Sequence, residues 1–150
     1  MFVLPPGAAA WEDRSAPAMH WWTMDLTVDP FDRDQRTWYV GVFSHTARSP
    51  AGNDGGMYRT IDRGHSWTRI NDAYRAQFLA VDPRHRDHGF LTTETQGLFE
   101  TRNLQADQPT FRSVDGYPFR QPTRVFFNPY QPREVWATSF GGGLRVVQQP

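Results

Sequence analysis

The chain contains no cysteine and no lysine. The lack of cysteine excludes a disulfide framework and any chemistry that needs a thiolate, and it leaves the redox compartment open. All sixteen basic residues are arginine, whose planar guanidinium suits two-point contacts with carboxylates. No residue pattern indicates a cofactor, and none is expected.

Net charge and long apolar runs are lacking as well. Sixteen arginines balance sixteen acidic residues, so no strong field favours nucleic acid or an anionic membrane surface. No window resembles a membrane span. The first ten residues lack a basic segment, and two prolines interrupt their apolar run, which is unlike a signal peptide. We therefore expect neither nucleic acid nor a membrane as partner, and a cytoplasmic location by default.

Aromatic residues, glycine and proline are abundant. Eleven Phe, six Trp and five Tyr accompany twelve Gly and twelve Pro. Aromatic and β-branched residues favour strands, whereas glycine and proline favour turns. The composition therefore predicts an all-β protein of short strands, with one domain over residues 1–150.

A unit of sequence occurs three times. Each copy begins with an apolar strand that ends at an Asp-Pro or Asn-Pro turn, and Asp82 follows Asp29 by 53 residues while Asn128 follows Asp82 by 46. Such a period is close to that of one propeller blade. Second strands are expected at 37–43, 89–93 and 134–138, and third strands at 56–60, 97–101 and 143–147. A fourth strand is expected at 66–70 and again at 110–114.

These units predict blades of four antiparallel strands at about 22–72, 75–115 and 122–147. The third unit ends without its outer strand, whereas residues 9–15 precede the first unit and align with the segment around Trp67. Propellers often close by pairing strands from the two ends of the chain, because closure removes exposed sheet edges. Residues 9–15 are therefore expected to form an outer strand.

One segment of the first unit carries a recognisable motif. Thr60, Asp62, Gly64, Ser66 and Trp67 match the pattern Ser/Thr-x-Asp-x-Gly-x-Ser/Thr-Trp. This pattern resembles the Asp-box of the BNR/Asp-box repeat β-propeller family, which includes sialidases, oligoxyloglucan-type glycosidases, sortilin-type receptors and photosystem assembly factors. The resemblance implies a structural turn at the blade periphery. The second unit, at 101–107, lacks the Gly and the Trp of the motif.

The resemblance also implies where a ligand would bind. In propellers the ligand face carries the loops before each innermost strand, here about 12–24, 71–78 and 115–124, and those between second and third strands, here about 44–55, 94–96 and 139–142. Aromatic rings and arginines in these loops suit sugar rings and carboxylates. The candidate ligand-binding residues are Trp21, Trp22, Arg75, Arg120 and Arg124. An alternative is that Trp21 and Trp22 only pack the entry into the first unit.

Catalytic candidates are few. An ordinary glycosidase needs two carboxylates on either side of the scissile bond, and Asp25 and Glu94 are the weak candidates here. The Phe/Tyr-Arg-Ile-Pro motif of sialidases is missing. The turn at 84–88 contains His85 and His88 without a spacing typical of metal ligands, so we expect a solvated turn and no metal site.

Three blades leave exposed flanks, because propellers typically have 4–8. A homodimer would complete a six-bladed ring with two-fold symmetry, and a fragment of a longer propeller is the alternative. The predicted function is a non-catalytic binding or scaffold module that engages a glycan, peptide or protein on its loop face. The alternative is a glycoside hydrolase-like protein or fragment, and a third interpretation is an assembly factor that recognises another protein through Arg75, Arg120 and Arg124. The family is often exported, which leaves the compartment open.

Overall fold

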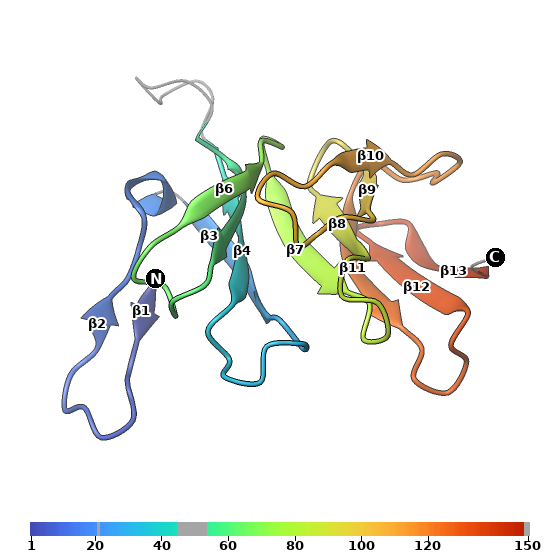
Figure 1. Cartoon of the computed structure of the whole chain (residues 1–150). Coiled ribbons are helices and arrows are strands. Elements are labelled where there is room, and N and C mark those ends of the chain that lie inside the picture. Colours follow the sequence, from blue (N-terminus) through green and yellow to red (C-terminus); the bar gives the residue numbers. More distant parts are fainter. Residues whose placement is uncertain (21, 45–53, 149–150) are drawn as a thin grey trace.

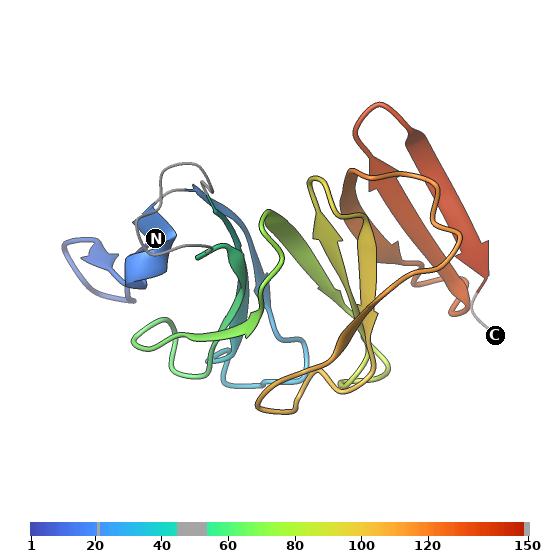
Figure 2. The ribbon, with the colours of Figure 1, turned by 90° about the horizontal axis from the view of Figure 1, so that it is seen from above.

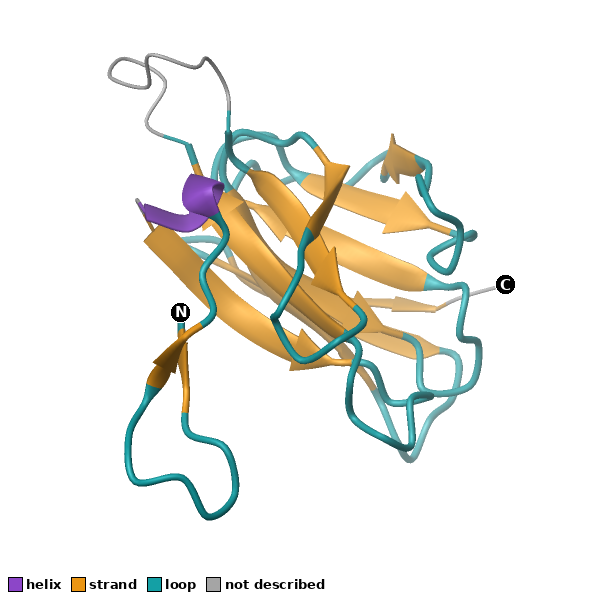
Figure 3. Ribbon diagram, turned by 60° about the vertical axis from the view of Figure 1, so that its left-hand side comes forward, coloured by secondary structure: helices purple, strands orange, loops and turns teal. Residues whose placement is uncertain are grey.

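The structure is a computed structural model that describes residues 1–20, 22–44 and 54–148. The all-β prediction is confirmed: across these ranges the regular structure consists of strands and one 3-10 turn, η1 (Pro17–His20), with no α-helix (Figure 3). No helix in the described part of the chain is long and apolar enough to span a membrane. The strands form antiparallel sheets of two to four strands.

A short hairpin precedes three larger sheets. The amino-terminal hairpin pairs β1 (Phe2–Val3) with β2 (Glu12–Asp13). The first sheet has the order β3 (Trp22–Val28), β4 (Trp38–Phe43), β5 (Gly56–Thr60) and β6 (Thr68–Asn71). The second sheet has the order β7 (Ala76–Val81), β8 (Gly89–Thr93), β9 (Leu98–Thr101) and β10 (Phe111–Ser113). The third sheet contains β11 (Pro122–Phe127), β12 (Glu134–Ser139) and β13 (Gly143–Gln148).

The three larger sheets follow one another in chain order. Figures 1 and 2 show them side by side, with the amino-terminal hairpin at one end of the row and β13 at the other. The first strand of each sheet lies toward its neighbours, since β7 contacts both β3 and β11. Each sheet is a meander in which sequential strands pair, which is the pairing expected from short turns between them.

The same local devices recur in all three sheets. A β-bulge interrupts the first strand of each, between Thr23 and Leu26, between Ala76 and Phe78, and between Pro122 and Arg124. The strand then ends at an Asx turn, in which the side-chain oxygen of Asp29, Asp82 or Asn128 accepts a 2.9 Å hydrogen bond from the backbone N–H two residues later. A short polar side chain therefore fixes the same turn three times.

Two apolar cores hold the row of sheets together. Between the first and second sheets, Tyr39, Met57 and Ile70 meet Leu79 and Leu91. Between the second and third sheets a second core forms from Ala80, Phe90, Leu98, Val125, Val135 and Ala137. Side chains that point to opposite faces alternate along the strands of the second sheet, so this sheet contributes to both cores.

The amino-terminal segment differs from the expected outer strand at 9–15. The described strand is only Glu12–Asp13, and it pairs with β1 rather than with β13 of the same chain. The segment instead covers part of the free face of the first sheet, where Met1, Ala16 and Met19 pack against Val42 and Tyr58. The segment leaves Met24, Leu26 and Val28 on β3 uncovered.

Candidate functional site

The motif at 60–67 forms a closed network of hydrogen bonds in the turn between β5 and β6. Asp62 accepts hydrogen bonds from Thr60 Oγ1 at 2.7 Å, from the Ser66 backbone N–H at 2.9 Å and from Ser66 Oγ at 2.6 Å. Thr60 Oγ1 in turn accepts the N–H of Gly64 at 2.9 Å. Gly64 has a φ of +87°, a left-handed conformation that glycine adopts without strain.

The carboxyl of Asp62 is kept ionised by this network. Burial opposes ionisation, but the hydrogen bonds from Ser66 and Thr60 outweigh it and lower the pKa of Asp62 to about 2. Trp67 is half-buried and donates its indole N–H to the Arg14 carbonyl at 2.8 Å. The side chains of Thr60, Asp62 and Ser66 are therefore engaged with one another, and Trp67 ties the amino-terminal segment to the first sheet.

The second sheet contains a similar turn that the sequence motif did not reveal. Thr101 Oγ1 lies 3.2 Å from Asn103 Oδ1, and the same Asn103 oxygen accepts the N–H of Thr110 at 2.9 Å. Asn103 thus occupies the role of Asp62, and Thr110 that of Ser66, in a longer turn. The Gly and Trp are absent, as the sequence shows. The sequence signal that could have revealed this turn is Thr-x-Asn at 101–103, followed by Thr110 and Phe111 at the start of the next strand.

The bulges near the starts of the three first strands, called the rim below, bring together one residue from each large sheet. Asp25, Phe78 and Arg124 occupy corresponding positions beside the bulges of β3, β7 and β11. Arg124 forms an ion pair with Asp25, and its guanidinium lies 4.8 Å from the centre of the Phe78 ring. Asp25, a weak catalytic candidate, is therefore held by an arginine that bridges the second sheet.

The other weak catalytic candidate is also held by an arginine. Glu94 forms an ion pair with Arg75, and both side chains are about one-third exposed. The Arg75 guanidinium lies 4.6 Å from the centre of the Phe43 ring and 5.6 Å from that of Trp22. A guanidinium over two rings gains cation–π attraction in addition to the ion pair. In the described part of the chain no hydrogen bond or ion pair joins Asp25 to Glu94.

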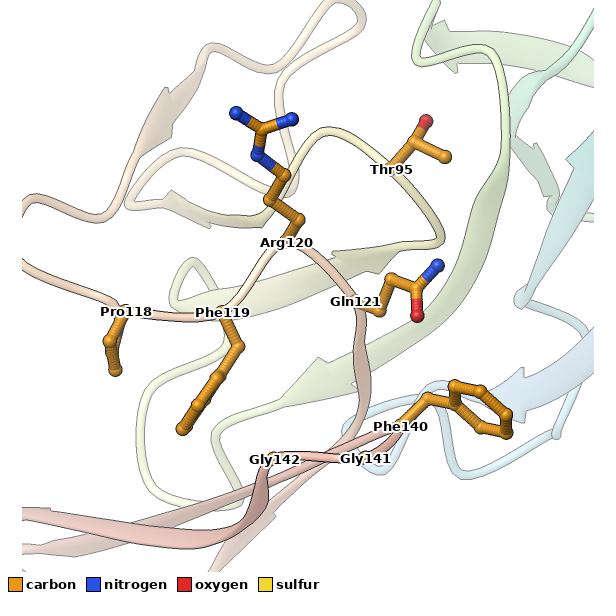
Figure 4. A pocket seen from close by; sticks show the side chains of 8 residues that line it. All are labelled: Thr95, Pro118, Phe119, Arg120, Gln121, Phe140, Gly141 and Gly142. Carbon is orange, nitrogen blue, oxygen red and sulfur yellow. The ribbon is translucent and has the colours of Figure 1, made fainter.

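A hollow of ≈ 680 Å³ opens between the ends of the second and third sheets (Figure 4). It is bounded by the loop after β8, the loop before β11 and the turn between β12 and β13; the lining residues are Thr95, Pro118, Phe119, Arg120, Gln121, Phe140, Gly141 and Gly142. Arg120 and Thr95 lie on one side of the opening, and Phe140 and the two glycines lie on the other. The hollow thus combines a cation, an amide, a hydroxyl and an aromatic ring.

The loop before β11 is fixed on both sides. The carbonyl of Arg120 accepts the N–H of Gly97 at 3.1 Å, and the carbonyl of Gln121 accepts the N–H of Phe140 at 3.0 Å. Gly142 permits a close approach of Phe119, since an added Cβ would lie 2.6 Å from the ring. The Arg120 guanidinium makes no ion pair or hydrogen bond within the described ranges, in contrast to the guanidiniums of Arg75 and Arg124.

The turn at 84–88 corrects one expectation, because His88 is buried rather than solvated. Its Nδ1 lies 3.0 Å from Asp82 Oδ2 and its Nε2 lies 2.8 Å from Glu100 Oε1. Burial raises the pKa of Asp82, but hydrogen bonds from Arg84 and His88 hold it well below the ordinary value. The His88 ring therefore lies between two carboxylates and links the turn after β7 to β9. The Phe127 ring on the third sheet covers His88.

Comparisons with known proteins do not assign a family. Neither the protein-family models nor the curated proteins include one that matches this chain. The resemblance to Asp-box propellers therefore rests on the residues of the motif and stays a prediction.

The structure places the remaining predicted residues as follows. Trp22 is more than half exposed beside Arg75. Trp21 lies outside the described residues, as does most of the loop at 44–55. Sequence reasoning named Arg120 but missed Thr95, Gln121 and Phe140 around the same hollow, because the three loops that line it are brought together only by the packing of adjacent sheets. Among the described residues no group of three or more His, Asp or Glu side chains is arranged to hold a metal ion.

Proposed function

We propose that this chain is a non-catalytic binding or scaffold module of the Asp-box propeller type. Its three large sheets serve as blades, and its loop face engages a glycan, peptide or protein. As a homodimer, the module completes a ring of six blades. The recurring bulges and Asx turns and the Thr60–Trp67 turn support the assignment of the sheets as blades.

One contrast between arginines carries the proposal of binding without catalysis. The guanidiniums of Arg75 and Arg124 are occupied by Glu94 and Asp25, the two carboxylates considered for catalysis. Arg120, by comparison, lines the hollow and has no ion pair or side-chain hydrogen bond to any residue that the structure describes. A guanidinium on one side of a hollow and an exposed aromatic ring on the other suit a ligand with a carboxylate or hydroxyl groups and a flat apolar surface. Among the three arginines named as protein-recognition candidates, Arg120 is therefore the one available to a partner.

An array of immobilised oligosaccharides and acidic peptides, followed by calorimetry with each compound bound, tests this proposal. Arg120→Ala is expected to weaken binding about tenfold, because a hydrogen bond to a charged group contributes about 1.5–3 kcal/mol. Arg112→Ala is the matched control, since Arg112 is an exposed arginine on β10, away from the hollow. Equal affinities of Arg120→Ala and the unmodified chain would contradict the proposed site.

The alternative function is a glycoside hydrolase, and it makes a different prediction. Hydrolysis of aryl glycosides that disappears in both Asp25→Asn and Glu94→Gln would favour it. Two carboxylates fit that chemistry only if one acts as acid and the other as base or nucleophile. Each carboxylate is instead held in an ion pair, Asp25 with Arg124 and Glu94 with Arg75, and no hydrogen bond or ion pair joins the two within the described residues.

A further inference from the structure

The third sheet has an uncovered apolar face at the end of the row. Phe126, Trp136 and Val146 are paired in register across β11, β12 and β13, so their side chains share one face. They are 46%, 38% and 50% exposed, and Leu144 on the same face is 49% exposed. The opposite face of this sheet is buried against the second sheet through Val125, Val135 and Ala137. The outward face is left without a neighbour in the described part of the chain, and β13 at the end of the sheet is exposed along its whole length.

The first sheet has a similar uncovered face at the other end of the row. Met24, Leu26 and Val28 on β3 are 46%, 45% and 39% exposed. The rest of this face, at Val42 and Tyr58, is covered by the amino-terminal segment. A groove of ≈ 430 Å³ remains between the hairpin and β3, and it is bounded by Met1, Phe2, Val3, Leu4, Trp11, Thr23, Met24, Asp25, Leu26 and Trp38.

The exposed residues occupy the same register positions as residues that are buried inside the row. Leu26, Leu79 and Val125 on the first strands pair with Val40, Leu91 and Ala137 on the second strands. The residues that come immediately before these second-strand partners are therefore equivalent, and they are Tyr39, Phe90 and Trp136. Tyr39 is 1% and Phe90 is 7% exposed, whereas Trp136 is 38% exposed. The free face of the third sheet is thus the same kind of surface that the first and second sheets bury.

The free face of the first sheet follows the same pattern. Leu26, Leu79 and Val125 are equivalent, since they pair with Val40, Leu91 and Ala137. Leu79 and Val125 are 1% and 2% exposed, but Leu26 is 45% exposed. The two ends of the row are therefore the two halves of one sheet-on-sheet interface that already occurs twice within the chain.

We propose that a second copy of this chain covers both ends, with the free face of each third sheet packed on the free face of the partner's first sheet. The proposal rests on the assignment of the three sheets as blades. Two such contacts related by a two-fold axis give six blades, which lies within the range of 4–8 found in propellers. The contact repeats an interface established inside the chain, which favours a second copy over an unrelated partner.

The position of the amino-terminal hairpin fits this assembly. The hairpin lies beside the groove on the first sheet, where the third sheet of the partner would enter. The outer edge of β13 has no strand paired to it in the described part of the chain. We infer that the hairpin extends the partner's third sheet at this edge, because an unpaired edge strand is the usual site of strand addition. Both copies would then contribute to each closing blade.

A pair of cysteines tests the predicted contact. Thr27 Oγ1 donates a 2.7 Å hydrogen bond to the Leu79 carbonyl, so these residues mark where the first and second sheets meet. The equivalent positions at the predicted contact are Phe126 of one copy and Leu26 of the other. The native chain has no cysteine. The double variant Leu26→Cys/Phe126→Cys should therefore oxidise to a covalent dimer that migrates at about twice 17.3 kDa.

The single variants Leu26→Cys and Phe126→Cys should each run as a monomer on the same denaturing gel, because the predicted contact places Leu26 opposite Phe126 and not opposite a second Leu26. Ile61→Cys/Tyr130→Cys is the matched control, since both residues are highly exposed but lie outside the two free faces. Failure of the Leu26/Phe126 pair to form the dimer, a dimer of equal yield in the control, or a ladder of larger species from an open chain of contacts would overturn the proposal.

A second set of variants keeps this result separate from the proposed function. Leu144→Arg should convert the dimer to a folded monomer, whereas Ile61→Arg should leave it unchanged. Binding at the loop face is then measured on the monomeric variant. If the cysteine pair cross-links but Arg120→Ala does not change ligand binding, the proposed site alone is contradicted. If binding depends on Arg120 but the cysteine pair does not cross-link, the second copy alone is contradicted.

Discussion

Arg75 and Arg124 have the same local arrangement, with an aromatic ring on one side of the guanidinium and a carboxylate at its end. A partly exposed ion pair alone contributes little to stability, typically 0 to about 1 kcal/mol. The ring adds cation–π attraction and limits the freedom of the arginine. At both positions the arginine also links different sheets or strands at the rim, so its role in the described structure is to fix the rim.

Asp62 gives a pH-dependent prediction at the residue scale. Its pKa falls from the ordinary 3.8 to about 2 in the folded chain. A carboxyl with a lowered pKa stabilises the fold at pH values above 3.8, and this stabilisation disappears as the pH falls from 3.8 toward 2. Thermal unfolding at pH 5, 4, 3 and 2 should show a smaller loss of Tm in Asp62→Asn than in the unmodified chain over that interval.

The control for Asp62 is Asp34→Asn, because Asp34 is exposed and only its backbone takes part in hydrogen bonds. This variant should follow the pH dependence of the unmodified chain. An Asp62→Asn protein that loses Tm as steeply as the control between pH 4 and pH 2 contradicts the role given to the turn.

His88 gives a second prediction at this scale. His88→Leu removes the hydrogen bonds to Asp82 and Glu100, while leaving both carboxylates in place. The free energy of unfolding should fall by about 1.5–3 kcal/mol, because the buried carboxylate of Asp82 loses a hydrogen-bond partner. Urea unfolding at pH 6 measures this loss of unfolding free energy. His85→Leu is the comparison, since His85 also contacts Asp82 but is largely exposed; a loss as large as that of His88→Leu would contradict the buried link.

At the scale of elements, the order of strands was predictable because each strand is bounded by local signals. Apolar strands that end at Asp-Pro or Asn-Pro turns located β3, β7 and β11, and glycine turns located the third strands. The amino-terminal hairpin was not predicted, since β1 and β2 have two residues each and carry little pattern. The burial of His88 was missed for another reason: it depends on Phe127, which comes from a different sheet.

The turn around Asn103 provides the prediction for this scale. Asn103→Ala removes the acceptor of the Thr110 N–H and the contact with Thr101. It should lower the free energy of unfolding by about 1 kcal/mol, equivalent to about 2–4 °C in Tm. Asp107→Ala is the control, because only its backbone carbonyl is bonded in this turn. Unchanged stability of Asn103→Ala in a calorimeter would show that the turn is held by other contacts.

At the scale of the whole molecule, the exposed flanks are the feature that the sequence pattern implied and the structure locates. Three repeats predicted that the ends of the row would be uncovered, and the structure shows which residues they are: Met24, Leu26 and Val28 at one end, and Phe126, Trp136, Leu144 and Val146 at the other. The loop-face hollow could be predicted only as a set of loops, since its shape depends on how two sheets pack. Large apolar surfaces of this kind mark interaction sites.

The molar mass of the unmodified chain, measured by light scattering during size-exclusion chromatography, tests the central claim most directly. A ring of two copies predicts a single species of about twice 17.3 kDa that persists on dilution through the micromolar range. A folded, monodisperse species of 17.3 kDa at those concentrations would contradict it.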